Sequence, residues 1–373
     1  LLMPDQRRIL SNPQNLYMWF EIGTDGEQPP FRSATALMRH FWCYKRQSIE
    51  RQITGLGKMN MVEVDKIIDR LVCYMEKNGK VSAPGVIISR YPPSAIETLE
   101  SHGIIQKQNG SISFCHQSYL DYMVAEKLCC EIIEGGSIIH WLGPKDKQSL
   151  FRREQLRQAL VLLAEDNPDF FLDAVSKILD SSDVRFHIKH LALEVISSID
   201  ASLNSNRCDF IFDLLDNPLW RKSILKTVLQ GNKSWVGVLI SKGFLDNWLK
   251  GTSASHCDDA ISILESVSTT LPDTVANILA PLVSQGGIWP ERAFHAIGWQ
   301  ITEDSDSLFA LRLKLINQGY LPSFLDWPKI AQTSPLKGIQ LSAALLSSLP
   351  EDVDAAHRRN HSEQWYDHEI EAL

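Results

Sequence analysis

Residues Ser111–Leu128 read SISFCHQSYLDYMVAEKL, and this stretch decides the fold that we predict for the first third of the chain. Its first four residues, Ser111–Phe114, alternate polar and apolar side chains, as a short half-buried strand does. From Gln117 to Glu134 apolar residues recur at helical spacing, which predicts a long amphipathic helix. The chain is therefore expected to change from strand to helix at Cys115-His116.

The residues just before this stretch extend the pattern. Asn109-Gly110 is typical of a tight hairpin turn, and a second strand-like run, 104–107, precedes it. A short helix is expected over 94–101, ended by Gly103. Helix, strand, turn, strand and helix follow one another in this order at the end of a winged helix. The remaining helices of that domain would come from residues before Ser94.

Further helices are predicted upstream. Residues 1–22 indicate two short helices separated at Ser11-Asn12-Pro13, because Asn12 can cap a helix and Pro13 suits a first helical turn, where no backbone donor is needed. Long helices are predicted over 33–52 and 62–77, since each places its apolar residues on one face.

After Gly135-Gly136 the pattern is helical to the end of the chain, with no further convincing strand. The predicted helices form pairs: 150–164 with 169–180, 185–200 with 208–216, 219–230 with 234–250, 257–270 with 273–285, and 290–301 with 305–318. The pairs start roughly 33 to 38 residues apart, a period found in helical-hairpin solenoids. One hairpin cannot bury its apolar face alone, so we expect stacked, HEAT-like hairpins, although no strict consensus recurs.

These patterns predict a mainly α fold. A helical segment and a winged helix with one small β-hairpin would be followed by an α-solenoid. The expected boundaries are 1–32 for the helical segment, 33–136 for the winged-helix region, 137–350 for the helical-repeat scaffold and 351–373 for a polar tail or the start of a further segment.

Composition narrows the class of protein. The 373 residues include 37 basic and 45 acidic ones, a formal net charge of -8, which does not favour nucleic-acid binding. The seven cysteines are scattered and form no C-x-x-C pair, as expected in a reducing compartment. We find no signal peptide and no apolar run near the ~18 residues of a membrane span, so a cytoplasmic protein without a membrane partner is expected. Because the chain starts without Met and in a helical pattern, we expect it to be a piece of a longer protein.

The search for catalytic and metal-binding motifs predicts neither. Gly55-Leu56-Gly57-Lys58-Met59 is the one candidate phosphate loop, but it lacks the first P-loop glycine and has Met59 in place of the magnesium-binding hydroxyl. We therefore interpret it as an ordinary loop between helices. The pair His187 and His190, and the cluster His256-Cys257-Asp258-Asp259, each offer too few ligands with local support for a metal site.

The opening stretch resembles the winged-helix signature of NACHT-type STAND NTPases. That signature has a strand ending in Phe-x-His, an aromatic residue three positions on, an acidic-aromatic pair and then an alanine. The residues in register with it are Phe114, His116, Tyr119, Asp121, Tyr122 and Ala125. The run Arg8–Tyr17 similarly resembles the segment after the ATPase core, where a proline-marked turn opens a helix. From residue 137 onward the chain is similar to that family's helical superstructure only in general character.

The resemblance implies two nucleotide contacts. His116 would act as the phosphate sensor at the β-phosphate of ATP or ADP, and Pro13 would pack against the adenine. An imidazole between a strand and a helix, close to the helix's first amides, can donate to a phosphate oxygen. Local structure offers an alternative for both residues, because His116 could simply cap the helix that begins at Gln117 and Pro13 could simply start a helix.

The function expected from the resemblance is regulatory. The chain would be a non-catalytic sensor part of a STAND signalling ATPase of the kind used in antiphage innate immunity. It would bind no nucleotide by itself, close over ATP or ADP held by the missing ATPase core, bind a protein ligand on its helical scaffold, and oligomerise when the full-length protein is active. The first alternative is a helical-repeat adaptor with no nucleotide role. A winged-helix nucleic-acid binder is less favoured, because the helix 117–134 carries four acidic residues against Lys127 and would repel phosphates.

Overall fold

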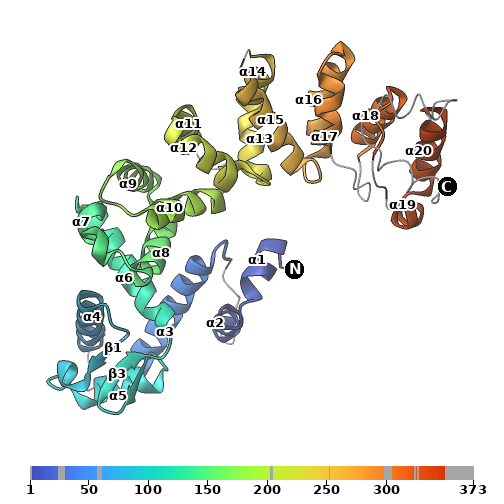
Figure 1. Ribbon diagram of the computed structural model, residues 1–373. Coiled ribbons are helices and arrows are strands. Elements are labelled where there is room, and N and C mark those ends of the chain that lie inside the picture. The colour runs from blue at the N-terminus through green and yellow to red at the C-terminus, as the bar shows by residue number, and fades with distance from the viewer. Residues whose placement is uncertain are drawn as a thin grey trace. The chain divides into compact units, whose positions relative to one another are not determined.

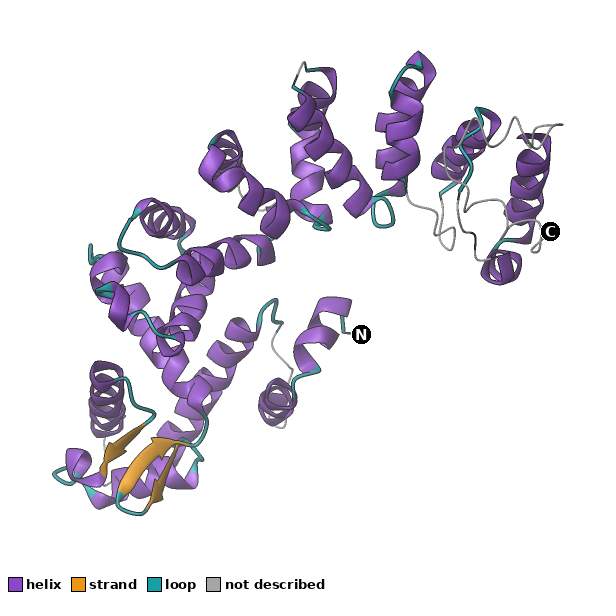
Figure 2. Cartoon of the chain, in the orientation of Figure 1, coloured by secondary structure: helices purple, strands orange, loops and turns teal. Residues whose placement is uncertain are grey.

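The computed structural model describes two compact units, unit 1 (Leu1–Ile199) and unit 2 (Asp200–Leu373). The described residues are 2–23, 30–56, 61–201, 205–251, 253–297, 305–322, 325 and 327–348. Both units consist mainly of helices, and unit 1 also holds a small three-stranded antiparallel sheet (Figures 1 and 2). The predicted mainly α fold class is confirmed at this level.

Unit 1 begins with the two short helices that the sequence predicts. They are α1 (Pro4–Leu10) and α2 (Pro13–Gly23). The side-chain oxygen of Asn12 accepts the backbone N–H of Gln14 at 2.9 Å, so Asn12 caps α2 as expected. Helix α2 buries Met18 and Ile22 and packs against the long helix α3 (Ala34–Leu56), which is followed by α4 (Met61–Asn78).

The sheet contains the predicted hairpin and one additional strand. Strands β2 (Ile105–Gln108) and β3 (Ser111–Phe114) pair in register Ile105 with Phe114, and the turn residues Asn109 and Gly110 have φ of 51° and 76°. Positive φ at both positions is what the tightest hairpin turns require. The strand β1 (Ser82–Pro84), which pairs with the other edge of β3, was not predicted. It is three residues long and ends in proline, so it carries no alternation that a sequence pattern could reveal.

The remaining elements of unit 1 are helical. They are the short helices η1 (Gly85–Ile88) and η2 (Lys145–Lys147) and the α-helices α5 (Pro93–Ser101), α6 (Gln117–Ile133), α7 (Ile138–Leu142), α8 (Leu150–Asp166), α9 (Pro168–Asp180) and α10 (Phe186–Ser198). Helix α6 packs against α3, α4 and above all α8. Its residues from Tyr119 to Ala125 are all buried, so the predicted one-sided amphipathic pattern does not hold there. Neighbours on several sides, and not one core face, enclose this part of α6.

Unit 2 is a succession of helices that pack on near neighbours in the chain. They are α11 (Ser205–Asp216), α12 (Pro218–Ile224), the π-helical turn η4 (Leu225–Leu229), α13 (Lys233–Ser241), α14 (Phe244–Lys250), α15 (Ala254–Val267), α16 (Pro272–Gln285), α17 (Trp289–Ala296), α18 (Asp306–Asn317), α19 (Trp327–Thr333) and α20 (Pro335–Ser348). The single helix predicted over 234–250 is wrong, because Gly243 takes a φ of +77° and divides it into α13 and α14. None of the described helices in either unit has the length and apolar character to cross a bilayer.

Candidate functional site

His116 lies at the junction of β3 and α6, with its side chain exposed. It is the N-cap residue of α6, and its Nδ1 accepts the backbone N–H of Ser118 at 3.4 Å and lies 3.1 Å from the Ser118 hydroxyl. An Nδ1 that accepts these hydrogen bonds assigns the proton of a neutral imidazole to Nε2. Among the described residues, Nε2 has no hydrogen-bond partner. The two interpretations of His116 are therefore compatible, because capping through Nδ1 leaves Nε2–H free to donate to a ligand.

The charge state of His116 agrees with that assignment. Partial burial lowers the pKa of the imidazole below its ordinary value of 6.5, so the ring is neutral at physiological pH. A neutral ring has one donor and one acceptor, and here the protein occupies the acceptor. His116 can thus offer one N–H to an oxyanion, next to the N-terminal amides of a long helix.

Pro13 lies in the first turn of α2, exposed, and the structure brings this turn to the first turn of α6. The Gln14 side-chain amide donates to the Ser118 hydroxyl, although the two residues are 104 positions apart in the sequence. The same hydroxyl contacts His116 Nδ1. A chain of hydrogen bonds therefore joins the residue after Pro13 to His116. The sequence named both site residues, but it did not indicate the Gln14–Ser118 link that brings them together.

A row of aromatic rings holds the two helix starts in place. Phe41 of α3 is fully buried, with its ring centroid 6.3 Å from that of Tyr17 in α2 and 5.8 Å from that of Tyr119 in α6. The Tyr119 ring in turn lies 6.4 Å from the His116 ring. These separations are typical of packed aromatic pairs, so Phe41 of α3 packs between α2 and α6 and holds the two helices side by side.

Lys45 of α3 adds an ion pair to the contact between α2 and α3. It is buried, forms an ion pair with Glu21 of α2, and donates to the carbonyl oxygen of His102 at 3.1 Å. The Glu21 carboxylate also accepts from the Tyr17 hydroxyl, which, with burial, raises the pKa of Tyr17 to about 12. A buried charge is held only where it is paired, so this cluster ties α2 firmly to α3.

The outer face of α2 is apolar and uncovered. Leu16, Tyr17 and Phe20 are 48%, 55% and 67% exposed, and together with Pro13 they follow the spacing i, i+3, i+4, i+7 of one helix face. We call these four residues the α2 stripe. The opposite face of α2 buries Met18 and Ile22, and within the stripe Tyr17 also contacts Phe41, but much of each stripe side chain remains exposed. Contiguous exposed apolar residues of this kind mark interaction surfaces.

Asp121, also part of the quoted signature, lies in the buried interface between α6 and α8 and not at the exposed site. It is 3% exposed, and its carboxylate accepts from Gln155 Nε2 at 3.3 Å. Loss of hydration raises its pKa to about 7, against the opposing effect of hydrogen bonds from Gln155 and Gln117. Sequence reasoning named Asp121 but missed its burial, because nothing in its local pattern distinguishes a buried aspartate from an exposed one.

Three side chains of the other candidate clusters are paired with neighbouring side chains. Asp259 accepts two hydrogen bonds from Arg221, at 2.9 and 2.6 Å, and Asp258 pairs with Arg292 at 3.0 Å. His190 faces Glu194 at 3.4 Å in a helical i, i+4 pair. Within the described residues, no group of three or more potential ligands could hold a metal ion. Of the candidate phosphate loop, residues 57–59 lie outside the described residues.

Comparison of the chain with family models, with curated proteins and with solved structures found no match.

Proposed function

We propose that this chain is the regulatory part of a NACHT-type STAND signalling ATPase, in which His116 senses the phosphates of a nucleotide held by an ATPase core outside these residues. The observation that carries the proposal is the exposed Nε2–H of His116 beside the first turn of α2, where Pro13 lies. A donor for phosphate and an apolar residue for the base thus occupy one surface of unit 1.

Electrostatics supports an anionic ligand at this surface. Helix α2 has 11 residues and α6 has 17, and the Gln14–Ser118 hydrogen bond joins their first turns. Each helix start carries about half a positive charge from its unpaired N–H groups, and these favour an anion. Neither first turn contains an acidic side chain that would repel one.

The α2 stripe supports a partner that covers this same surface. In the proposed protein the ATPase core would bury Leu16, Tyr17 and Phe20 while the nucleotide is bound between the core and His116. The nucleotide would then hold a closed state, and exchange of ADP for ATP would shift the population towards an open, oligomerising state.

The remaining parts of the proposal concern architecture and setting. Residues 33–136 would be the winged helix, since α5, β2, β3 and α6 follow the expected order. The helices from residue 137 onward would be HEAT-like hairpins that bind a protein ligand in the cytoplasm, with antiphage defence as the biological role. Helix α6 carries Glu126, Glu131 and Glu134, which disfavour nucleic acid as the partner.

Two substitutions at one position separate sensing from capping. His116→Asp keeps an oxygen that can cap α6 but removes the N–H donor, whereas His116→Ala removes both. In the longer protein that includes the core, both variants should bind ADP at least about tenfold more weakly, since a hydrogen bond to a charged group contributes about 1.5–3 kcal/mol. Both should also activate without ligand. His140→Ala, at an exposed histidine of α7, is the matched control and should change neither property.

The result also decides between the two classes of protein. ADP affinity and activation that stay unchanged in both His116 variants would reject the sensor role and leave the helical-repeat adaptor. The absence of Walker A and Walker B motifs in the longer protein would have the same meaning.

A further inference from the structure

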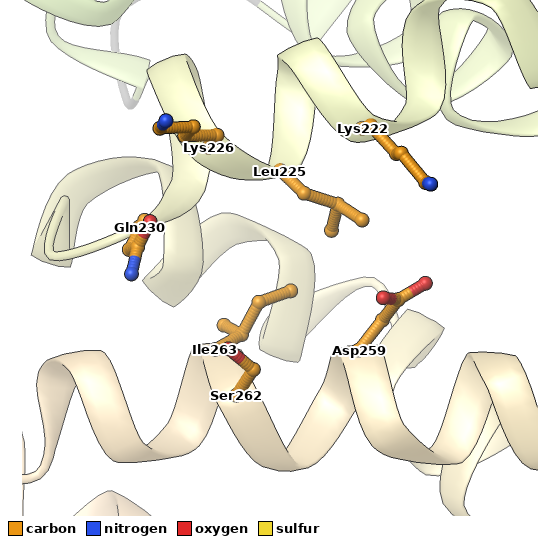
Figure 3. Close-up of a pocket in the computed structure, with 7 residues that line it drawn as sticks. All are labelled: Lys222, Leu225, Lys226, Gln230, Asp259, Ser262 and Ile263. Carbon is orange, nitrogen blue, oxygen red and sulfur yellow. The ribbon is translucent and has the colours of Figure 1, made fainter.

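Unit 2 contains a groove of about 240 Å³ between the α12–η4 segment and α15 (Figure 3). The figure shows Leu225 and Ile263 facing each other across its middle, Lys222 and Asp259 on opposite sides of one end, and Lys226 and Gln230 at the other end. Ile263 is buried and Leu225 half-buried. The groove therefore has an apolar centre and polar ends.

The walls of the groove are fixed at both ends. At one end, Arg221 donates two hydrogen bonds to Asp259. At the other end, the Ser266 hydroxyl accepts the backbone N–H of Gly231 over 2.9 Å. Asp259 and Ser266 are two helical turns apart on α15, so the open length is about 10 Å. An extended peptide rises about 3.4 Å per residue, and three residues would fill this length.

The wall opposite α15 is an irregular helix. Residues Leu225–Leu229 form a π-helical turn, and Gln230 N–H donates to the carbonyl oxygen of Leu225 at 2.9 Å. Such wider turns are rare, and they are found frequently at functional sites. Here the turn places Leu225 between Lys222 and Lys226, so that an aliphatic side chain lies between two ammonium groups.

The wall of the groove that residues 217–245 form is basic, whereas α15 on the other side carries Asp258, Asp259 and Glu265. Residues 217–245 contain five basic residues (Arg221, Lys222, Lys226, Lys233 and Lys242) and no acidic residue, whereas the chain carries a net charge of -8. Arg221 is neutralised by Asp259, and Lys242 pairs with Asp209. Lys222 and Lys226 are exposed and form no ion pair among the described residues. Both lie on the rim of the apolar groove, and Asp259, the acidic residue in the lining, is paired with Arg221.

We propose that this groove binds an acidic segment of a protein partner, with an aliphatic side chain between Leu225 and Ile263 and flanking carboxylates on Lys222 and Lys226. Gln230 and the Ser262 hydroxyl provide hydrogen bonds to the backbone of that segment. This inference rests on the proposed function in one respect, namely that it takes unit 2 as part of the ligand-binding scaffold.

A protein segment fits the groove better than a nucleic acid. Duplex DNA is held by many phosphate contacts, whereas only two ammonium groups are free here. The guanidinium of Arg221, the group best suited to phosphate, is already paired with Asp259. An apolar centre has no role against a phosphate backbone.

Fluorescence anisotropy with two labelled nine-residue peptides tests the proposal on the chain 1–373. Glutamate and leucine alternate in the first peptide, and glutamine replaces glutamate in the second. The acidic peptide should bind, more weakly as salt is added, and the glutamine peptide should bind several-fold more weakly. The double variant Lys222→Gln/Lys226→Gln should weaken the acidic peptide about three- to tenfold, the effect of two partly exposed ion pairs.

The matched control makes the same charge change elsewhere. Lys145→Gln/Lys147→Gln removes two exposed lysines of η2 in unit 1 and should leave the affinity unchanged. Equal affinity for both peptides, no binding of either, or an equal loss in the control variant would overturn the proposal. So would a short DNA duplex that binds more tightly than the acidic peptide and is released by the Lys222/Lys226 substitutions. None of these outcomes bears on His116, whose role is decided separately by ADP affinity.

Discussion

Replacement of the buried Asp121 by asparagine should make unit 1 more stable at neutral and higher pH, and should change its stability little at acidic pH. Asp121 is 3% exposed between α6 and α8, and its pKa in the folded chain is raised from 3.8 to about 7. Because the raised pKa belongs to an acid, the folded state disfavours the charged form. The resulting loss of stability is absent below about pH 4, grows as the pH rises to about 7, and is constant above that.

The magnitude follows from the same values. Each pH unit between a folded and an unfolded pKa corresponds to about 1.4 kcal/mol, so a rise from 3.8 to about 7 corresponds to about 4 kcal/mol at pH 8. Asparagine has the same shape and no charge. Its oxygen can still accept from Gln155 Nε2, and its amide can donate to a neighbouring acceptor. We therefore expect Asp121→Asn to raise the free energy of unfolding at pH 8 by up to about 4 kcal/mol and to change it little at pH 4.

Urea unfolding of the wild-type chain and of Asp121→Asn at pH 4, 5, 6, 7 and 8 measures this difference. Hydrogen exchange of peptides from α6 and α8, compared at one pH, shows whether the gain arises at this interface. Asp173→Asn is the control, because Asp173 is exposed on α9 and pairs with Lys177 one turn away. Its effect should stay within about 0.5 kcal/mol. An Asp121→Asn variant that is less stable than wild type at pH 8 would refute the reasoning, since it would mean that Asp121 is charged and stabilising in the folded chain.

Three further predictions concern stability and can be measured by urea or thermal unfolding. Phe41→Ala removes the ring between Tyr17 and Tyr119 and should lower the free energy of unfolding by about 3–5 kcal/mol. Phe20→Ala, on the exposed α2 stripe, should lower it by less than about 0.5 kcal/mol. Similar losses in the two variants would contradict the role of Phe41 in holding α2 beside α6. Gly243→Ala should lower the free energy of unfolding by about 1–2 kcal/mol, because φ at this position is +77°. Gly237→Ala lies inside α13, where an added Cβ meets open space, so it should be neutral or stabilising by up to about 1 kcal/mol. His116→Ala should cost about 1 kcal/mol through loss of the α6 cap and His116→Asp should cost less; an equal loss in both would show that the cap is not what stabilises this junction.

Local signals predicted most elements of the fold. Asn109-Gly110 predicts a hairpin because both residues accept positive φ, and the structure has that hairpin. Asn12 and Pro13 predict a helix start, and α2 starts there. Elements that depend on distant partners escaped prediction. Strand β1 exists only because β3 offers it an edge, and the burial of Asp121 follows from the position of α8.

The candidate site divides in the same way. The resemblance of the sequence to a family signature pointed to His116 and Pro13. Local signals placed each residue at the start of a helix, because caps and prolines act on the residues next to them. Only the tertiary structure decided that the two helix starts meet, through Gln14 and Ser118, with Phe41 packed behind them. Only the tertiary structure brought Ile263 opposite Leu225, 38 residues away, to form the groove in unit 2. Contacts between distant segments depend on how all the helices pack together, and no local pattern records that arrangement.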